Sequence, residues 1–411
     1  MAERTARRGG SPGLRDVVER AWSGRGLAST ALLPASWLFG GIAAIRRGLF
    51  ERGVLTTNRL PVPVVVVGNL VTGGAGFIGS NLADRLAGQG HDVLVYDALA
   101  RPGVEANLAW LRRRHGARIR PVIADLRDRA TLEDAAAGAS AVFHMAAQVA
   151  VTTSLSDPEL DFDVNLRGTV FLLEALRKQP APPPVIFAST NKVYGNLADV
   201  VLQRDGDAYL PEDPGLRAHG IGEDRPLSFY TPYGCSKGAA DQYVLDYARG
   251  FGVPACVLRM SCIYGPRQLG TEDQGWLAHF LYSVQAGRPI SIYGDGRQVR
   301  DVLYVDDAVD AYMAAWERIG QVSGQAFNLG GGPANAVTLL EVLAEIGEIS
   351  GRQPDLRFSD WRPGDQRYFV ADTRRAAAAL SLGPAVGWQD GLRRLARWIA
   401  AERGLVADHA A

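Results

Sequence analysis

One glycine-rich stretch, Gly73–Gly79, constrains the fold of this chain more than any other part of the sequence. It follows apolar runs at 64–67 and 70–71 and precedes a segment in which Leu82 and Leu86 recur at helical spacing. A strand, a tight turn and a helix in this order place backbone amides at a helix N-terminus, where they bind a pyrophosphate. A small-residue turn without a ligand would give the same pattern. The residues expected to contact a dinucleotide here are Gly73, Gly76, Phe77, Ile78 and Gly79.

The strand that follows this helix ends on a carboxylate. The apolar run 93–96 ends at Asp97, which is 21 residues beyond Gly76. This spacing is typical of an acidic residue that binds the adenosine ribose hydroxyls, and its charge would repel a 2′-phosphate. The prediction is therefore NAD rather than NADP, although Arg101 leaves room for NADP. The alternative role for Asp97 is that of a turn or helix-cap residue.

Composition excludes several classes of protein. The chain has 411 residues, of which 47% are hydrophobic, so it is long enough for more than one domain. Its net charge is zero; residues 1–60 carry ten Arg and four acidic residues, a balance of +6, which leaves −6 on residues 61–411. The main body is therefore not a nucleic-acid binder by charge. The three cysteines lack metal spacing and a disulfide framework, which predicts no metal site and a cytoplasmic location.

The N-terminal region has a different character. Residues 27–45 contain no charged residue, and basic residues flank them on both sides. The length is at the limit of a membrane span, and Pro34 and several glycines weaken that interpretation. A peripheral contact through 27–47 at the inner face of the membrane fits as well, and so does a buried helix.

Beyond residue 69, apolar runs alternate with helical segments. This alternation predicts an α/β fold with a doubly wound parallel sheet, in which strands lie near 118–124, 141–146, 184–189 and 254–260. Residues at the carboxyl ends of such strands lie beside a bound dinucleotide. We therefore expect Asp125, Leu126 and Ala146 to contact the cofactor.

Two further motifs carry the predicted chemistry. Tyr233 and Lys237 are four residues apart, so on a helix they share one face. A nearby ammonium stabilises a phenolate, which would make Tyr233 an acid or base near neutral pH. The hydroxyl of Thr190 could hold a substrate oxygen. Taken alone, a Tyr-x-x-x-Lys pair is more often a surface contact.

Together these features resemble the extended short-chain dehydrogenase/reductase family, and within it the CDP-paratose 2-epimerases (CDP-tyvelose epimerases), over residues 69–403. The resemblance implies that bound NAD takes hydride from sugar carbon 2 while Tyr233 removes the hydroxyl proton and Thr190 shares the oxygen. Lys237 would also hold the nicotinamide ribose. The segments that carry the resemblance are Thr190–Gly195, Tyr233–Tyr243, Asp273–Trp276, Gln298–Leu303 and Asp365–Arg367.

The same resemblance implies a nucleotide-sugar substrate, preferably a CDP-sugar, and a homo-oligomer. Asn191 and Lys192 occupy the positions where sugar 4,6-dehydratases of the family carry Asp-Glu, so dehydration is disfavoured. The residues expected to contact the substrate are Asn191, Lys192, Arg267, Arg300 and Arg367. The glycine run 330–332 resembles a second phosphate loop but is interpreted mainly as a structural turn.

Residues 16–74 resemble a second family, the tetraacyldisaccharide 4′-kinases, which act on lipid A. Where that family has Gly-Lys-Thr in its phosphate loop, this chain has Gly76, Phe77 and Ile78, so the phosphate-binding lysine is absent. The N-terminus is therefore interpreted as a fused leader, and a non-catalytic NAD-binding protein is a further alternative. The predicted organisation is a leader at 1–68, a Rossmann domain at 69–260, a smaller and mainly substrate-binding lobe at 261–403, and a tail at 404–411.

Overall fold

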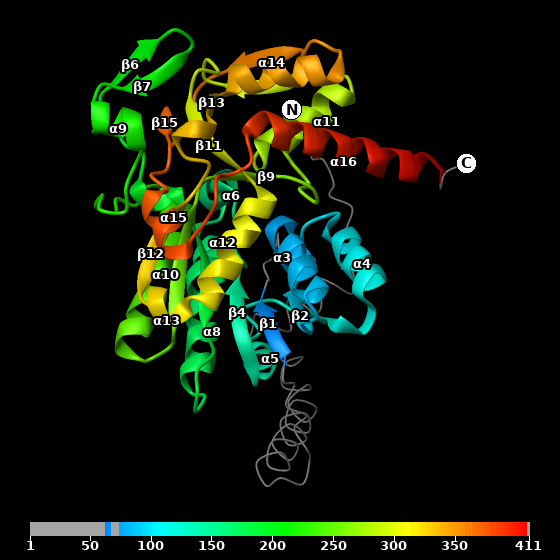
Figure 1. The fold of residues 1–411 in the computed structure, drawn as a ribbon, viewed down its shortest axis with the longest axis vertical. Helices are drawn as coiled ribbons and strands as arrows, with labels where there is room; N and C mark the ends of the chain where they lie inside the picture. The colour runs from blue at the N-terminus through cyan, green and yellow to red at the C-terminus, as the bar shows by residue number, and fades with distance from the viewer. Residues whose placement is uncertain (1–61, 67–73, 363, 409–411) are drawn as a thin grey trace, which may run out of the picture. The chain divides into compact units, whose positions relative to one another are not determined.

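The computed structural model describes residues 62–66, 74–362 and 364–408 (Figure 1). The chain divides into two compact units, Met1–Arg59 and Leu60–Ala411. The first unit, including the predicted membrane-contacting segment 27–47, lies outside the described residues, and so does Gly73. Within the described ranges, every helix is too short or too polar to cross a membrane.

A seven-stranded parallel sheet forms the centre of the second unit (Figure 1). Its strand order is β12-β8-β5-β4-β1-β2-β3, so the chain runs outward from β1 in both directions. This arrangement confirms the predicted doubly wound α/β fold, with the reversal of direction next to β1. The strands are β1 (Val62–Val66), β2 (Val93–Asp97), β3 (Ile119–Ile123), β4 (Ala139–His144), β5 (Val185–Thr190), β8 (Ala255–Met260) and β12 (Gln325–Leu329).

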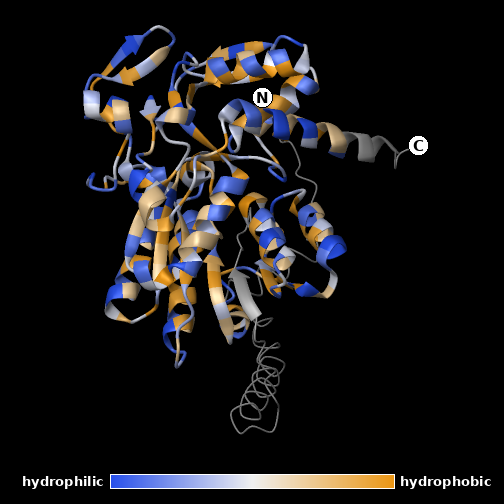
Figure 2. Cartoon of the chain, viewed as in Figure 1, coloured by the Kyte–Doolittle hydropathy of each residue, from blue (hydrophilic) through white to orange (hydrophobic). Residues whose placement is uncertain are grey.

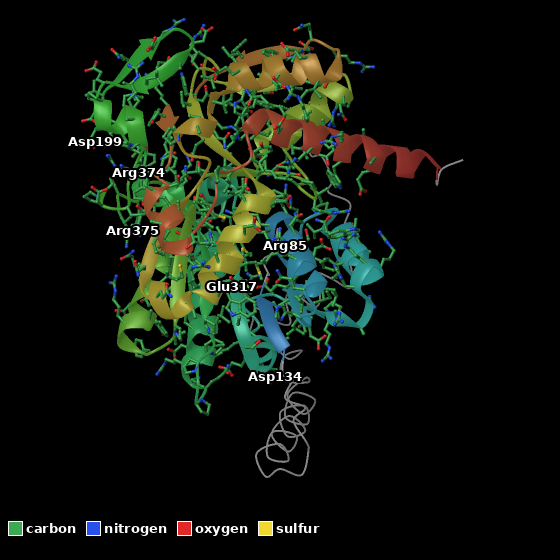
Figure 3. The ribbon with its side chains drawn as sticks, in the orientation of Figure 1. Arg85, Asp134, Asp199, Glu317, Arg374 and Arg375 are labelled. Carbon is green, nitrogen blue, oxygen red and sulfur yellow. The ribbon has the colours of Figure 1, made fainter. Side chains whose placement is uncertain are left out.

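Helices cover both faces of this sheet. One face packs against α3 (Phe77–Gly88), α4 (Val104–His115), α12 (Val305–Glu317) and α15 (Arg374–Leu380). The other face packs against α5 (Arg129–Ala136), α8 (Gly168–Arg177) and α10 (Thr231–Gly250). Apolar residues concentrate on the strands and on the helix faces that pack against them (Figure 2). Arg85 of α3, labelled in Figure 3, forms an ion pair with Asp310 of α12 and joins two neighbouring helices.

Two strands of the sheet come from unexpected parts of the sequence. The predicted leader ends at residue 68, between β1 and α3. β1 therefore lies within the segment that was predicted to be the leader. β1 pairs with both β2 and β4 and therefore occupies a central place. At the far edge, β12 pairs with β8 although its residues belong to the predicted substrate lobe. The cofactor sheet is thus built from a longer stretch of chain than 69–260.

Most of the remaining strands, together with several helices, form a smaller lobe with its own core. A four-stranded sheet joins β9 (Cys262–Tyr264), β11 (Val299–Tyr304), β13 (Ala336–Thr338) and β15 (Tyr368–Phe369). Beside it lie the strand pairs β10 (Ile290–Tyr293) with β14 (Leu356–Ser359) and β6 (Leu202–Asp205) with β7 (Ala208–Pro211). The helices of this lobe include α9 (Pro214–His219), α11 (Trp276–Gln285), α14 (Leu339–Ser350) and α16 (Trp388–Asp408), and α13 (Ile319–Val322) precedes β12.

The glycine run 330–332 has a packing role. A Cβ on Gly330 would lie 2.0 Å from a carboxylate oxygen of Asp301, and one on Gly331 would lie 2.1 Å from the Val302 carbonyl oxygen. Both positions therefore require glycine, because the chain after β12 lies against Asp301 and Val302 of β11. The run is a structural turn, as the sequence indicated.

Candidate active site

A cavity of about 450 Å³ opens at the carboxyl ends of the central strands. The N-terminus of α3 contributes Gly76 to Gly79, and the end of β5 with the following 3₁₀ turn η3 (Asn191–Tyr194) contributes Thr190, Asn191 and Lys192. Tyr233 comes from the first turn of α10, and Arg300 from β11. The fold therefore brings the glycine loop, the predicted catalytic hydroxyls and a substrate arginine to one cavity.

Thr190 and Tyr233 meet at the wall of this cavity. Thr190 ends β5, and Tyr233 follows Pro232, which occupies a first-turn position where a missing backbone N–H costs nothing. Their side chains share a hydrogen bond. The Thr190 Oγ1 also accepts a hydrogen bond of 3.2 Å from the Lys192 backbone N–H. The backbone of η3 therefore fixes the Thr190 hydroxyl next to Tyr233.

The protonation of Tyr233 differs from the expectation. Burial raises the pKa of Tyr233 to about 12, because a phenolate would lose its hydration. The hydrogen bond from Thr190 lowers this pKa and the nearby Asp161 raises it, but burial is the largest cause. Lys237 is not among the groups that shift this pKa, so the predicted lowering is not observed, and the phenol is protonated at neutral pH.

Lys237 is buried behind Tyr233 on the same helix. Its Nζ has no hydrogen-bond partner among the described residues, and it lies 4.2 Å from the centre of the Phe187 ring. Burial lowers the pKa of Lys237 to about 7, although Asp161 and Asp241 oppose this effect. A buried donor that lacks a partner requires one. The hydroxyls of a nicotinamide ribose fit this requirement, so the site fits NAD.

The helix end and Asp97 are also suited to a dinucleotide. No side chain caps α3, and its first turn has no acidic residue, so its N-terminus remains favourable for an anion. The Asp97 carboxylate is fully buried and accepts hydrogen bonds from the backbone N–H groups of Ala75 (2.7 Å) and Leu99 (2.8 Å). Burial raises the pKa of Asp97 to about 7. Asp97 therefore fixes the glycine loop, in addition to the ribose contact predicted for it.

The remaining predicted cofactor residues, like Asp97 and Lys237, lie outside the residues that line the cavity. Asp125 follows β3 and binds Arg127 through both carboxylate oxygens, at 2.9 and 3.0 Å. Leu126 and Ala146 are fully buried between the sheet and its helices. Arg101, which left room for NADP, donates to Gln274 and to the Leu269 carbonyl and is thus committed to the smaller lobe.

Three of the predicted substrate residues line the cavity: Asn191, Lys192 and Arg300. The Lys192 Nζ lies 3.4 Å from the Gly364 carbonyl oxygen and 3.9 Å from the Asp365 carboxylate. Burial lowers the pKa of Lys192, and Asp365 opposes this shift. Arg300 donates to the same carboxylate at 2.7 Å. This part of the cavity therefore carries two cations for one carboxylate.

Two other predicted arginines do not line it. The guanidinium of Arg267 lies 3.9 Å from the centre of the Trp110 ring and pairs with Glu402. Arg367 is exposed and lies over the rings of Tyr209 and Trp361. Arg362, which was not predicted from the sequence, does line the cavity, and its guanidinium lies 3.8 Å from the centre of the Tyr293 ring. The sequence signal that could have indicated Arg362 was its position three residues before Asp365, at the start of a segment that carries the family resemblance.

Comparison with known proteins agrees with this geometry. The profile of the NAD dependent epimerase/dehydratase family matches residues 69–330. A CDP-paratose 2-epimerase of Salmonella typhi is 40% identical over 338 residues, which cover 80% of this chain and 98% of that protein. The crystal structure of a Thermotoga maritima UDP-glucose 4-epimerase with UDP-glucose superimposes with a TM-score of 0.68 at 30% identity, covering 82% of this chain and 99% of that one. MoeE5, in complex with UDP-glucose and NAD, gives a TM-score of 0.68 at 29% identity, covering 83% and 99%.

The N-terminal resemblance is also borne out. The profile of the tetraacyldisaccharide-1-P 4′-kinases matches residues 28–95, which extends past the predicted end near residue 74 and overlaps the epimerase match. The overlap includes the loop at Gly76 to Ile78, which lacks the kinase lysine. Because the epimerase profile covers more than half of the chain, the chain belongs to the NAD dependent epimerase/dehydratase family.

Proposed function

We propose that this chain is an NAD-dependent epimerase that inverts carbon 2 of a CDP-3,6-dideoxyhexose, converting CDP-paratose to CDP-tyvelose. The observation that carries the proposal is the hydrogen-bonded pair Thr190 and Tyr233 in a cavity that Arg300 also lines. The identity to the Salmonella typhi epimerase supports the choice of sugar and nucleotide.

In this proposal the chain positions the sugar and moves one proton. The Thr190 hydroxyl binds the oxygen on carbon 2, and Tyr233 takes its proton and later returns it. NAD held at the N-terminus of α3 would supply reversible hydride transfer at carbon 2, which the inversion requires. A phenol whose pKa is raised to about 12 needs added positive charge to act as a base, and the Lys237 ammonium on the same helix face supplies it.

The cofactor contacts are assigned to the chain as follows. The open N-terminus of α3 binds the pyrophosphate, Asp97 binds the adenosine ribose, and Lys237 binds the nicotinamide ribose. Asp125, Leu126 and Ala146 lie at the strand ends on the adenine side and shape the site without lining the large cavity.

We assign the diphosphate of the substrate to Arg300 and Arg362. A guanidinium offers two parallel donors to a phosphate, and both groups line the cavity. Arg362 is also paired with Asp273 at 3.2 Å, so its position on Tyr293 is fixed from two sides. Lys192, beside Asp365, is assigned to the sugar end of the substrate.

The side chains that follow Thr190 argue against a dehydratase. Elimination of water needs an acid and a base at these positions, and the chain has Asn191 and Lys192. Another nucleotide-sugar epimerase of the family is the main alternative. The kinase reading of the leader has less support because Phe77 stands where the phosphate-binding lysine would be.

The test is incubation of the purified full chain with separate CDP-, UDP- and dTDP-sugars, followed by NMR of the products. We expect inversion at carbon 2 of CDP-paratose without a change in mass. Inversion at carbon 4 of a UDP-sugar instead, or loss of water from any substrate, would reject the assigned reaction.

The matched variants are Tyr233→Phe and Tyr243→Phe, two tyrosines of α10. Tyr233 lines the cavity, whereas Tyr243 is 45% exposed. Loss of the phenol at 233 should lower kcat about a thousandfold, the size of a general acid–base contribution, with the NAD content unchanged. Tyr243→Phe should retain normal turnover.

A further inference from the structure

A buried carboxylate lies next to the catalytic helix and has no role in the mechanism above. Asp161, in α7 (Pro158–Phe162), is fully buried. Its Oδ1 accepts hydrogen bonds from Gln148 at 2.9 Å and from Asn165 at 3.1 Å, and its Oδ2 accepts one from the Ser236 hydroxyl. All three donors are neutral. Burial raises the pKa of Asp161, although its three hydrogen bonds and the charge of Lys237 oppose this shift. A buried carboxylate with only neutral donors is costly unless a cation lies near it.

The local backbone holds Asp161 against α10. A π-helical turn, η2 (Asp163–Arg167), stands between α7 and α8, and such turns recur at functional sites. Its residue Asn165 donates to the Asp161 carboxylate and, at 3.0 Å, to the Ser236 hydroxyl. The wider turn therefore directs an amide toward α10, and that amide fixes the carboxylate beside Ser236.

Ser236 connects this carboxylate to the catalytic pair. It lies on α10 between Tyr233 and Lys237, directly before Lys237, and its hydroxyl donates to Asp161. The negative charge of Asp161 acts on both Tyr233 and Lys237. It raises the pKa of Tyr233, and it also raises the pKa of Lys237, against the lowering that burial causes.

The other groups around Lys237 do not supply a free negative charge. Asp241, one turn further along α10, is bound at 2.9 and 3.0 Å by the guanidinium of Arg259 on β8. His144 on β4 is neutral, because burial lowers its pKa to about 3. Phe187 on β5 offers only its ring face. Within the described part of the chain, Asp161 is the carboxylate near Lys237 whose charge no arginine offsets.

We propose that Asp161 is a positioning residue whose carboxylate is the counter-ion of the buried Lys237 ammonium. Through Ser236 and Asn165 it is held at a fixed place behind the catalytic helix and keeps Lys237 charged, so that the ammonium can stabilise the Tyr233 phenolate. The hydrogen bond from Ser236 places Asp161 beside the residue that precedes Lys237, and the effect of this carboxylate on turnover rests on the proposed function.

The chain has only three lysines, Lys178, Lys192 and Lys237, which permits a direct test. Lysine labelled with ¹³C at Cε reports its own protonation by NMR, and Lys178→Arg and Lys192→Arg assign the signals. In the NAD-loaded full chain, Asp161→Asn should lower the titration midpoint of Lys237 by about one pH unit or more, as loss of a nearby opposite charge does. The control is Asp163→Asn, whose carboxylate is 29% exposed and pairs with Arg167; it should leave that midpoint unchanged.

Turnover gives a second measurement. Because protonated Lys237 is the active form, the alkaline limb of the kcat profile should move to lower pH in Asp161→Asn, and Asp163→Asn should keep the original profile. If Asp161→Asn does not fold, Ser236→Ala removes one donor from the carboxylate and should shift the Lys237 midpoint in the same direction by a smaller amount. An unchanged midpoint in the folded variant overturns the proposal. A wild type without epimerase activity but with the expected midpoint shift would overturn only the proposed function.

Discussion

The guanidinium of Arg300 donates a 2.7 Å hydrogen bond to the carboxylate of Asp365 at the wall of the cavity. Arg300 also donates to the backbone carbonyls of Val299 and Gln366, so its plane is fixed. Although burial raises the pKa of Asp365, the cations Arg300 and Lys192 outweigh burial and hold that pKa below its usual value. Asp365 is therefore charged and keeps two cations oriented toward the cavity.

Replacement of Arg300 by lysine tests its assignment to the diphosphate. Lysine keeps the charge but loses the second parallel donor, so KM for the nucleotide sugar should rise about tenfold with kcat little changed. Steady-state kinetics measure this split. Arg367→Lys is the matched control, since Arg367 is exposed and does not line the cavity. If the two variants show equal KM increases, the diphosphate is not bound where we place it.

Asp97 should decide between NAD and NADP in a pH-dependent way. Its pKa is raised to about 7, so its charge is present above pH 7 and is lost as the pH falls through 7. The preference for NAD should therefore increase with pH, and Asp97→Asn should reduce it about tenfold at high pH by removing the charge repulsion. Dissociation constants of both nucleotides on either side of pH 7 measure this. The control is Asp92→Asn, directly before β2, where the side chain is 40% exposed. It should not alter the ratio of the two dissociation constants.

The buried pair Arg259 and Asp241 should contribute strongly to stability. The two side chains are 6% and 0% exposed. Arg259→Met leaves a buried carboxylate unpaired and should lower the free energy of unfolding by about 3 to 5 kcal/mol. Urea denaturation measures the loss, and the double variant Arg259→Met/Asp241→Leu should recover much of it. The control is Arg129→Ala, which breaks an exposed ion pair with Glu133 and should cost under about 1 kcal/mol. An equally small loss in Arg259→Met would contradict the expected contribution of the buried pair.

Two truncations separate the leader from the sheet. A chain that begins at Leu60 keeps β1 and should retain its bound NAD, its thermal stability and its activity. A chain that begins at Asn69 lacks β1, which pairs with β2 and β4, and should not fold. Fractionation of the full chain and the first truncation also tests the predicted membrane contact, which should be lost with residues 1–59. Normal folding of the shorter chain would show that other residues can fill the centre of the sheet.

Much of the site was predictable because its requirements are local. The α3 loop, the carboxylate at Asp97 and the Tyr233 and Lys237 pair each fall within one turn or one strand end, where spacing in sequence is spacing in space. The pKa of Tyr233 was not predictable in this way. It depends on how much protein surrounds the phenol, and burial is the largest cause of its raised pKa.

The sequence by itself determined the doubly wound sheet, the dinucleotide loop and the catalytic residue types, because each follows from a periodic pattern or a short spacing. Only the tertiary structure decided that Arg362 rather than Arg367 lines the cavity, that β12 completes the cofactor sheet, and that Asp161 is hydrogen-bonded to Ser236 beside Lys237. These relationships join residues far apart in the chain. Their distances are set by how strands and helices pack, and no local pattern of residues encodes them.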